Sequence, residues 1–203
     1  MADPSRLVLA SASPFRRQML ASAGLVFEIA PASIDERAVE NALIQSGQAV
    51  DASAVAIALA VAKGMAVGKG RPDALVIGCD QVLGFDGALL SKPETVAAGR
   101  AQLARLRGKT HTLHSGISLI HGGEVVWRHV DIARMTMRAF SDAWLDAYVA
   151  RMGERLCWTV GGYAIEAEGI QLFERVEGDH FTIIGLPLLP LLAKLRELGD
   201  LRR

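Results

Sequence analysis

Apolar runs of strand length alternate with longer apolar or amphipathic stretches along the first half of the chain. Arg6 to Ser11 is short and apolar, which predicts a buried strand. Ser13 and Pro14 supply an N-cap and a first-turn proline, so we expect a helix from there to Ala23, closed by Gly24. Further expected elements are a strand at Phe27 to Ala32, a charged loop at Ile34 to Gln48, a buried helix from Asp51 to roughly Met65 and a buried strand at Ala74 to Gly78.

Period-two alternation is the main signal in the second half. Apolar residues on both sides of Asp86-Gly87 predict one hairpin, and Thr110 to Ile120 with Glu124 to Met137 predict a longer antiparallel one. The remaining expected elements are helices at Thr95 to Leu106, Ser141 to Met152 and Pro187 to Leu198, and short strands at Tyr163 to Glu166, Gln171 to Val176 and Thr182 to Ile184.

This mixture of strands and helices is that of an α/β or α+β protein. A chain of 203 residues is long enough for one large buried core. The sequence has no internal repeat, low-complexity tract or linker-like segment, so we expect residues 1–203 to form a single domain. If that domain has two lobes, the cleft between them is the expected ligand site.

Composition excludes several classes of protein. With 51% hydrophobic and 22% charged residues, the chain is too apolar for disorder. Its 22 basic residues balance its 22 acidic ones, so no basic excess draws it to nucleic acid or to an anionic membrane, and any anionic ligand needs a local cluster of cations. The longest apolar run, Ala54 to Ala62, is far shorter than the ~18 residues of a membrane span.

Two further features bear on where the protein works. Met1 to Leu9 lacks the cationic start and apolar stretch of a signal peptide, so the expected location is the cytoplasm. Cys79 and Cys157 are the only cysteines and lie far apart, so we expect reduced side chains rather than a disulfide scaffold or a cysteine-based zinc site.

A first candidate site lies at Ser11 to Arg17, where a strand turns into a helix. Backbone N–H groups, two hydroxyls and one or two guanidinium groups would meet there around an anion, most naturally a phosphate. The alternative is an ordinary capped helix whose arginines face solvent, and the local pattern alone leaves both interpretations open.

A second candidate site centres on Asp80, at the end of the apolar strand Leu75 to Gly78. A carboxylate there can hold Mg²⁺ or orient water, and Lys92, which follows the Asp86-Gly87 hairpin, can neutralise phosphate charge. A surface aspartate with an exposed lysine is the alternative. Lys63 interrupts an apolar helix, where burial without a partner is costly, although a lone lysine often reaches solvent along its own stem.

Several familiar motifs are absent. Gly108-Lys109-Thr110 looks like the end of a P-loop, but Leu103 stands where the leading glycine belongs. His111 and His114 are three apart in an expected strand, which puts them on opposite faces, so a two-histidine metal site is not expected.

Short segments that share one order and spacing span nearly the whole chain: Leu9 to Arg17, Ile34-Asp35-Glu36, Ala62-Lys63, Gly78 to Val82, Ser91-Lys92-Pro93, Gly161-Gly162-Tyr163, and Gly178-Asp179 with Gly185-Leu186-Pro187. Together they resemble the Maf family. The resemblance implies an α/β fold related to the inosine triphosphate pyrophosphatases, with a mixed twisted sheet and flanking helices in two lobes around a central cleft. It also implies a nucleoside triphosphate pyrophosphatase that uses Mg²⁺ or Mn²⁺, and a possible homodimer.

The resemblance assigns roles by position. Ser13 and Arg16 match the phosphate-binding turn, and Lys63 and Lys92 match the lysines that face the triphosphate. In the same match Glu36 is a metal-associated carboxylate, and Asp80 is the catalytic base and a second metal ligand.

Three more positions, Phe15, Gln81 and Glu166, match the base-selecting set of the family. An ionised Glu166 only accepts hydrogen bonds, which suits the adjacent N1–H and N2–H₂ donors of guanine. Phe15 could stack on the base, and N7-methylation would add ~0.5–2 kcal/mol of cation–π attraction. The set therefore resembles that of the subgroup cleaving 7-methyl-GTP. The alternatives are a dTTP- or UTP-directed or broad-specificity pyrophosphatase, and a non-catalytic nucleotide-binding regulator of cell division.

Overall fold

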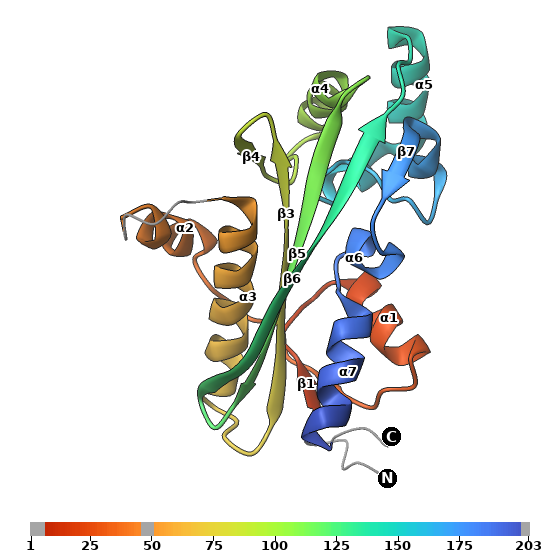
Figure 1. Ribbon diagram of the computed structural model, residues 1–203. Coiled ribbons are helices and arrows are strands. Elements are labelled where there is room, and N and C mark those ends of the chain that lie inside the picture. Colours follow the sequence, from red (N-terminus) through yellow and green to blue (C-terminus); the bar gives the residue numbers. More distant parts are fainter. Residues whose placement is uncertain (1–6, 46–50, 200–203) are drawn as a thin grey trace. The chain divides into compact units, whose positions relative to one another are not determined.

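The computed structural model describes residues 7–45 and 51–199 (Figure 1). Its residues fall into two compact units. The first comprises Met1–Gln81, Ser115–Asp131 and Gly185–Arg203, and the second comprises Val82–His114 and Ile132–Ile184. The expectation that residues 1–203 form one domain with two lobes around a cleft stays a prediction.

The strands form one mixed sheet, in the order β2-β1-β3-β5-β6-β7, with β4 paired to β3. Strand β1 runs parallel to β2 and β3, whereas β3–β4 and β6–β7 are antiparallel pairs. The predicted mixed α/β class is therefore confirmed. The strands are β1 (Leu7–Leu9), β2 (Glu28–Ile29), β3 (Leu75–Phe85), β4 (Ala88–Leu90), β5 (Thr110–His121), β6 (Glu124–Met137) and β7 (Phe173–Glu177).

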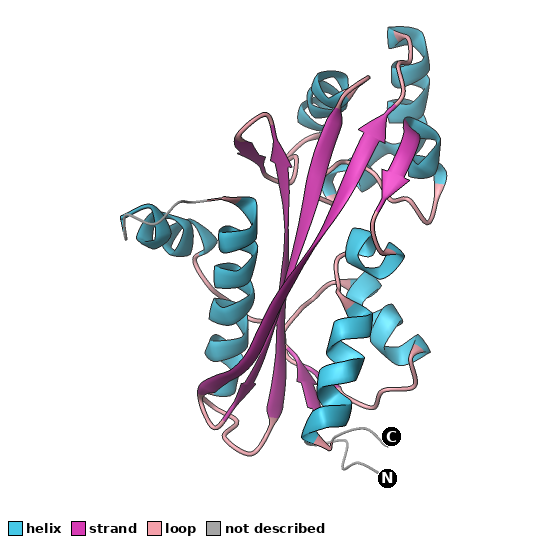
Figure 2. Cartoon of the chain, in the orientation of Figure 1, coloured by secondary structure: helices cyan, strands magenta, loops and turns pink. Residues whose placement is uncertain are grey.

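In the first unit, two of the predicted helices begin at polar capping residues, of which Ser13 is the predicted N-cap. Ser13 accepts a hydrogen bond from the backbone of Arg16 at the start of α1 (Pro14–Ser22), and Asp51 accepts one from Ala54 at the start of α3 (Ala52–Gly68). Helix α7 (Leu188–Leu198) likewise follows Pro187 as predicted. Figure 2 shows α3 on one side of the strands and α1 and α7 on the other.

A second helix of this unit, α2 (Glu36–Gln45), replaces most of the charged loop predicted at Ile34 to Gln48. Asp35 caps this helix, because its carboxylate accepts a hydrogen bond from the backbone of Ala38 at 3.0 Å. Val39 and Leu43 lie half-buried at helical spacing, and the helix packs against α3. The charged residues are therefore the solvent face of an amphipathic helix. Residues 46–48 of the predicted loop lie outside the described residues.

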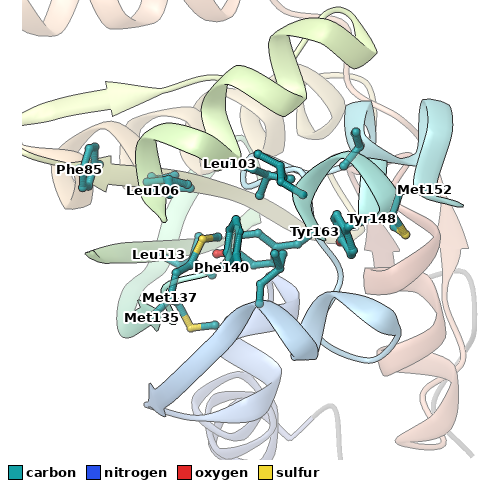
Figure 3. Packing of buried hydrophobic residues seen from close by; sticks show 14 of the residues in the cluster. Phe85, Leu103, Leu106, Leu113, Met135, Met137, Phe140, Tyr148, Met152 and Tyr163 are labelled. Atoms are coloured by element: carbon teal, nitrogen blue, oxygen red, sulfur yellow. The ribbon is translucent and has the colours of Figure 1, made fainter. Parts of the chain in front are cut away.

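The second unit has its own core, built around the helices α4 (Val96–Leu106) and α5 (Asp142–Met152). Thr95 and Ser141, with which the predicted helices begin, cap α4 and α5. Figure 3 shows how side chains from both helices and from the strands gather in this core. The buried members include Phe85, Leu103, Leu106, Leu113, Met135, Met137, Phe140, Tyr148, Met152 and Tyr163.

Predictions for the last quarter of the chain are partly wrong. Thr182 to Ile184 belongs to helix α6 (His180–Ile184), because the carboxylate of Asp179 accepts a hydrogen bond from the Thr182 backbone and overrides the strand preference of the β-branched run. Tyr163 to Glu166 is a loop in which the hydroxyl of Thr159 bonds to both backbone groups of Tyr163.

Two other predicted strands are displaced or shortened. The strand at Gln171 to Val176 begins later, at Phe173, after a short 3₁₀ helix, η2 (Glu168–Leu172); a similar one, η1 (Gly153–Cys157), follows α5. The strand at Phe27 to Ala32 shortens to β2.

Helix length and composition bear on membranes. Among residues 7–45 and 51–199, the structure has no helix long and apolar enough to cross a bilayer.

The core of the second unit contains an unusual polar residue, His111. Its Nε2 is hydrogen-bonded to the hydroxyl of Tyr163 at 2.5 Å, whereas its buried Nδ1 has no partner among the described residues. Burial lowers the pKa of this imidazole from 6.5 to about 4. The folded protein therefore holds His111 neutral at pH values where the unfolded chain protonates it.

The free energy of unfolding should consequently depend on pH through His111. Above pH 6.5 the imidazole is neutral in both the folded and the unfolded protein, and the stability is at its full value. As the pH falls towards 4, the unfolded chain binds a proton at His111 that the folded protein does not bind, so the free energy of unfolding decreases. The decrease amounts to about 3 kcal/mol. Urea unfolding at pH 7, 5.5 and 4.5 measures it. His111→Gln keeps an acceptor for Tyr163 but cannot titrate. Its free energy of unfolding should therefore fall less steeply between pH 7 and pH 4.5 than that of the wild-type protein. Identical slopes for both proteins would contradict the assignment.

Candidate active site

The first unit brings together residues from the ends of two parallel strands. Strand β1 stops at Leu9, and the chain turns through Ser11 into α1, whereas its neighbour β3 continues past Ile77 to Phe85. Asp80 thus lies inside an 11-residue strand rather than at the strand end predicted for it. It sits just beyond the point where β1 leaves the sheet, which is where a parallel sheet opens room for a ligand.

Arg16 is anchored at this opening by neutral oxygen atoms. Its Nε donates to the carbonyl of Gly185 at 2.9 Å, and its Nη1 donates to the hydroxyl of Ser11 at 3.2 Å and the carbonyl of Cys79 at 3.1 Å. No ion pair to Arg16 occurs within the described residues. Arg16 is therefore a fixed, half-buried positive charge, not the solvent-facing arginine of the alternative interpretation.

Ser13 adds the N-terminus of α1 to this cation. Its hydroxyl accepts from the Arg16 backbone at 3.4 Å, and its own N–H donates to Ser11 at 3.2 Å. Helix N-termini favour anions because their N–H groups and the helix dipole point outward. Phe15 lies half-buried in the first turn of the same helix. The strand-to-helix turn thus has the features of an anion site.

Lys63 joins three elements of the unit. Its ammonium group lies 2.5 Å from Oδ1 of Asp80 on β3 and 2.6 Å from Oε1 of Glu36 on α2. The side chains of Lys63 and Asp80 are only 15% and 11% exposed, whereas that of Glu36 is 53% exposed. Lys63, which interrupts an apolar helix and which the resemblance assigns to the triphosphate, is therefore the partner of two predicted site carboxylates.

Burial and charge oppose each other in this cluster. Burial raises the pKa of the Asp80 carboxyl above its ordinary value, against the opposing positive charges of Lys63 and Arg16. Burial also disfavours a charged Lys63, but Asp80 and Glu36 outweigh it and raise the pKa of the ammonium group. Asp80 thus combines a proton affinity above that of a free aspartate with two nearby cations.

The donor set fits a divalent cation shared with a ligand. Asp80 and Glu36 offer hard oxygen ligands, and the described residues contain no cluster of three or more metal-ligating side chains. Mg²⁺ usually binds one or two carboxylates and completes its coordination with water and substrate phosphates. In addition, the charge of Lys63 is outweighed by those of Asp80 and Glu36, which leaves Arg16 as the cation of this cluster without an ion-pair partner among the described residues, so a polyphosphate would need a further cation.

Gln81 extends the site beyond Asp80. Its side-chain nitrogen donates to the hydroxyl of the fully buried Ser115 at 3.0 Å. Gly185, at a φ of +115° that favours glycine, lies against both Gln81 and the guanidinium of Arg16. The predicted base-selecting Gln81 and the predicted phosphate-binding Arg16 are therefore neighbours.

Three features of the site were missed as site residues. The carbonyls of Gly185 and Cys79 anchor Arg16, and Ser115 orients Gln81. Every residue has a backbone carbonyl, so the residue type does not show which carbonyls will bind Arg16.

Two predicted site residues belong to the second unit. Lys92 is exposed in the loop after β4, and Glu166 is exposed in the loop that follows Tyr163. Their roles stay predictions, as does the central cleft.

Comparison with known proteins gives a consistent picture. A family model described as Maf-like protein matches residues 6–198. A Rhizobium meliloti protein named 7-methyl-GTP pyrophosphatase is 52% identical over 193 residues, covering 95% of this chain and 96% of that protein. A Mesorhizobium japonicum protein of the same name is 50% identical and covers 96% of each chain. A Nitrobacter winogradskyi protein named nucleoside triphosphate pyrophosphatase is 47% identical, covering 94% of this chain and 92% of that protein.

Solved structures resemble the chain less closely. A nucleoside-triphosphatase / dITP/XTP pyrophosphatase from Mycobacterium abscessus aligns with a TM-score of 0.39 at 14% identity, covering 74% of this chain and 95% of that one.

The uncompensated charge of Arg16 leads to a binding prediction. Arg16→Met should weaken the binding of inorganic pyrophosphate about tenfold or more, because a charge-assisted hydrogen-bond donor is lost. The matched control is Arg17→Met, which removes the exposed neighbouring arginine. Isothermal titration calorimetry measures both, and equal affinities for the two variants would contradict the anion site.

Proposed function

Because the chain belongs to the Maf family, we propose that it is a nucleoside triphosphate pyrophosphatase. It would hydrolyse the bond between the α and β phosphates and release a nucleoside monophosphate and pyrophosphate. The observation that carries this proposal is the cluster in the first unit, where the fixed cation Arg16 and the ion-paired Lys63 surround the buried carboxylate of Asp80. Hydrolysis of a polyanion needs both features, cations for the phosphates and a base for water.

Each residue of the cluster has a separate role in the proposed reaction. Arg16, with the N-terminus of α1 at Ser13, binds phosphate oxygens and fixes the direction of the triphosphate. Lys63 holds Asp80 and Glu36 in place and adds positive charge beside the phosphates. Asp80 accepts the proton of the attacking water as the general base of the reaction. Lys92 contributes a further phosphate contact in this scheme.

A divalent metal ion completes the proposed site. Mg²⁺ or Mn²⁺, held by oxygen atoms of Asp80 and Glu36, supplies charge neutralisation at the phosphates when bound. The requirement follows from the balance of the protein's own charges around Arg16 and Lys63.

We further propose 7-methyl-GTP as the preferred substrate, with a house-cleaning role in removing non-standard nucleotides. The names of the two relatives at 52% and 50% identity support this preference. Gln81, which lies beside the same glycine as Arg16, would contact the base in this scheme. Phe15 would stack on the cationic base and Glu166 would accept from guanine. The cytoplasmic location and the homodimer expected from the sequence stay predictions.

A pyrophosphate-release assay with Mg²⁺ or Mn²⁺ tests the reaction. Asp80→Asn should lower kcat by about 100-fold or more while nucleotide binding persists, because the amide cannot take a proton. The control is Asp86→Asn, the same change in the exposed turn between β3 and β4. Release of pyrophosphate by Asp80→Asn at the unchanged rate would remove Asp80 from the reaction.

The same assay tests substrate preference with 7-methyl-GTP, GTP, dTTP and UTP side by side. We expect the highest kcat/KM with 7-methyl-GTP. A higher value with dTTP or UTP, or equal values throughout, would contradict the base preference and leave the hydrolysis standing. Failure to release pyrophosphate from any nucleotide would contradict the hydrolysis and favour a nucleotide-binding regulator.

A further inference from the structure

We propose that Ser118, together with Gly78 and Gly116, positions the site by fixing how closely α3 lies on the sheet. This spacing decides whether Lys63 reaches Asp80. The inference rests on the proposed function for its kinetic test, but its geometric content concerns only the first unit. Ser118 touches neither substrate nor reacting atoms in this scheme, so it is a positioning residue.

The first observation is a hydrogen bond from the sheet to the middle of the helix. The fully buried hydroxyl of Ser118, on β5, donates to the carbonyl oxygen of Ala60 at 3.0 Å. A carbonyl in the interior of α3 already accepts from the N–H four residues later, so this bond satisfies no helix-end group. Its effect is to tie the backbone of α3 to the sheet, three residues before Lys63.

The second observation is the lack of space for a side chain beneath the helix. A Cβ on Gly116 would collide with the backbone of Ala56 and Ile57, and a Cβ on Gly78 would collide with that of Ala60. Neither glycine has a positive φ, so space rather than backbone conformation requires glycine there. Backbone atoms cannot turn aside as a flexible side chain can, so either Cβ would push the helix outward.

The third observation links this contact to the ion pair. Gly78 and Asp80 are two residues apart on β3 and share one face of the strand, as Gly116 and Ser118 do on β5. Ala60 and Lys63 are three apart on α3 and share a helix face. The contact at Ala60 and the 2.5 Å ion pair at Lys63 are therefore successive steps along one helix–strand contact. Outward movement of α3 would separate Lys63 from Asp80.

A double-mutant cycle with Lys63→Met tests this coupling. Ser118→Ala should lower kcat about tenfold with KM changed less than about twofold, because Arg16 still holds the phosphates. In the Lys63→Met background the same substitution should change kcat less than about twofold, since the group through which it acts is gone. Gly116→Ala should show the same pattern with a larger decrease in kcat, about 100-fold. Circular dichroism establishes that each variant is folded.

Gly68→Ala is the matched control on the same helix. A Cβ there meets only the side chains of Ile120 and Val76, which can adjust, so kcat should stay near the wild-type value. Should Ser118→Ala lower kcat equally in both backgrounds, or not at all, the positioning role is overturned.

A spectroscopic readout separates this inference from the proposed function. The ammonium protons of Lys63, assigned with Lys63→Met, should exchange with solvent faster in Ser118→Ala than in wild type or Gly68→Ala. Unchanged exchange in Ser118→Ala overturns the inference whether or not the wild-type protein hydrolyses nucleotides. Absence of pyrophosphate release by wild type, with faster exchange in Ser118→Ala, overturns the proposed function and supports the positioning role.

Discussion

The ion pair between Lys63 and Asp80 is the interaction on which the rest of the site depends. A carboxylate taken out of water is costly unless a cation and hydrogen bonds replace its hydration. Asp80 obtains that cation from the preceding helix, α3, and the same ammonium group also holds Glu36. Strand β3 and helices α2 and α3 are thereby joined at one point. Without Lys63, burial alone would favour a protonated Asp80 and two unlinked helices.

The two cations of the site, Lys63 and Arg16, have different kinds of partner. At Lys63 one ammonium group contacts two carboxylates, which stabilises the fold and leaves no excess of positive charge. At Arg16 the cation is held by carbonyl and hydroxyl oxygens alone, so its charge stays available to a ligand. The first arrangement suits a group that must be held in place, and the second suits a group that must bind an anion.

Local signals explain which elements the sequence predicts well. The caps at Ser13, Asp51, Thr95 and Ser141 lie beside the helices that they start, and the long hairpin of β5 and β6 shows a clear period of two. The failures at α2 and α6 have different causes. Asp35 and Asp179 cap these helices, but charged residues conceal the first helix and β-branched residues conceal the second.

The site, too, contains residues that the sequence identifies and partners that it does not. The types and spacing of Arg16, Lys63 and Asp80 mark them as candidates, and family resemblance assigns their roles. The partners that hold them in place have no such mark: the carbonyl of Gly185 lies 169 residues from Arg16, and the hydroxyl of Ser118 lies 58 residues from Ala60. Contacts between a side chain and a distant backbone atom depend on the fold, so only the structure shows them.

The stability of the Lys63–Asp80 pair is the most direct test of this account. Urea unfolding of Lys63→Met, Asp80→Asn and the double variant measures the coupling between the two side chains. The account predicts that Lys63→Met alone lowers the free energy of unfolding by about 3 kcal/mol, because a buried carboxylate loses its cation. It also predicts that the double variant loses at least about 1 kcal/mol less than the sum of the single losses. Losses that add to within about 0.5 kcal/mol would contradict it.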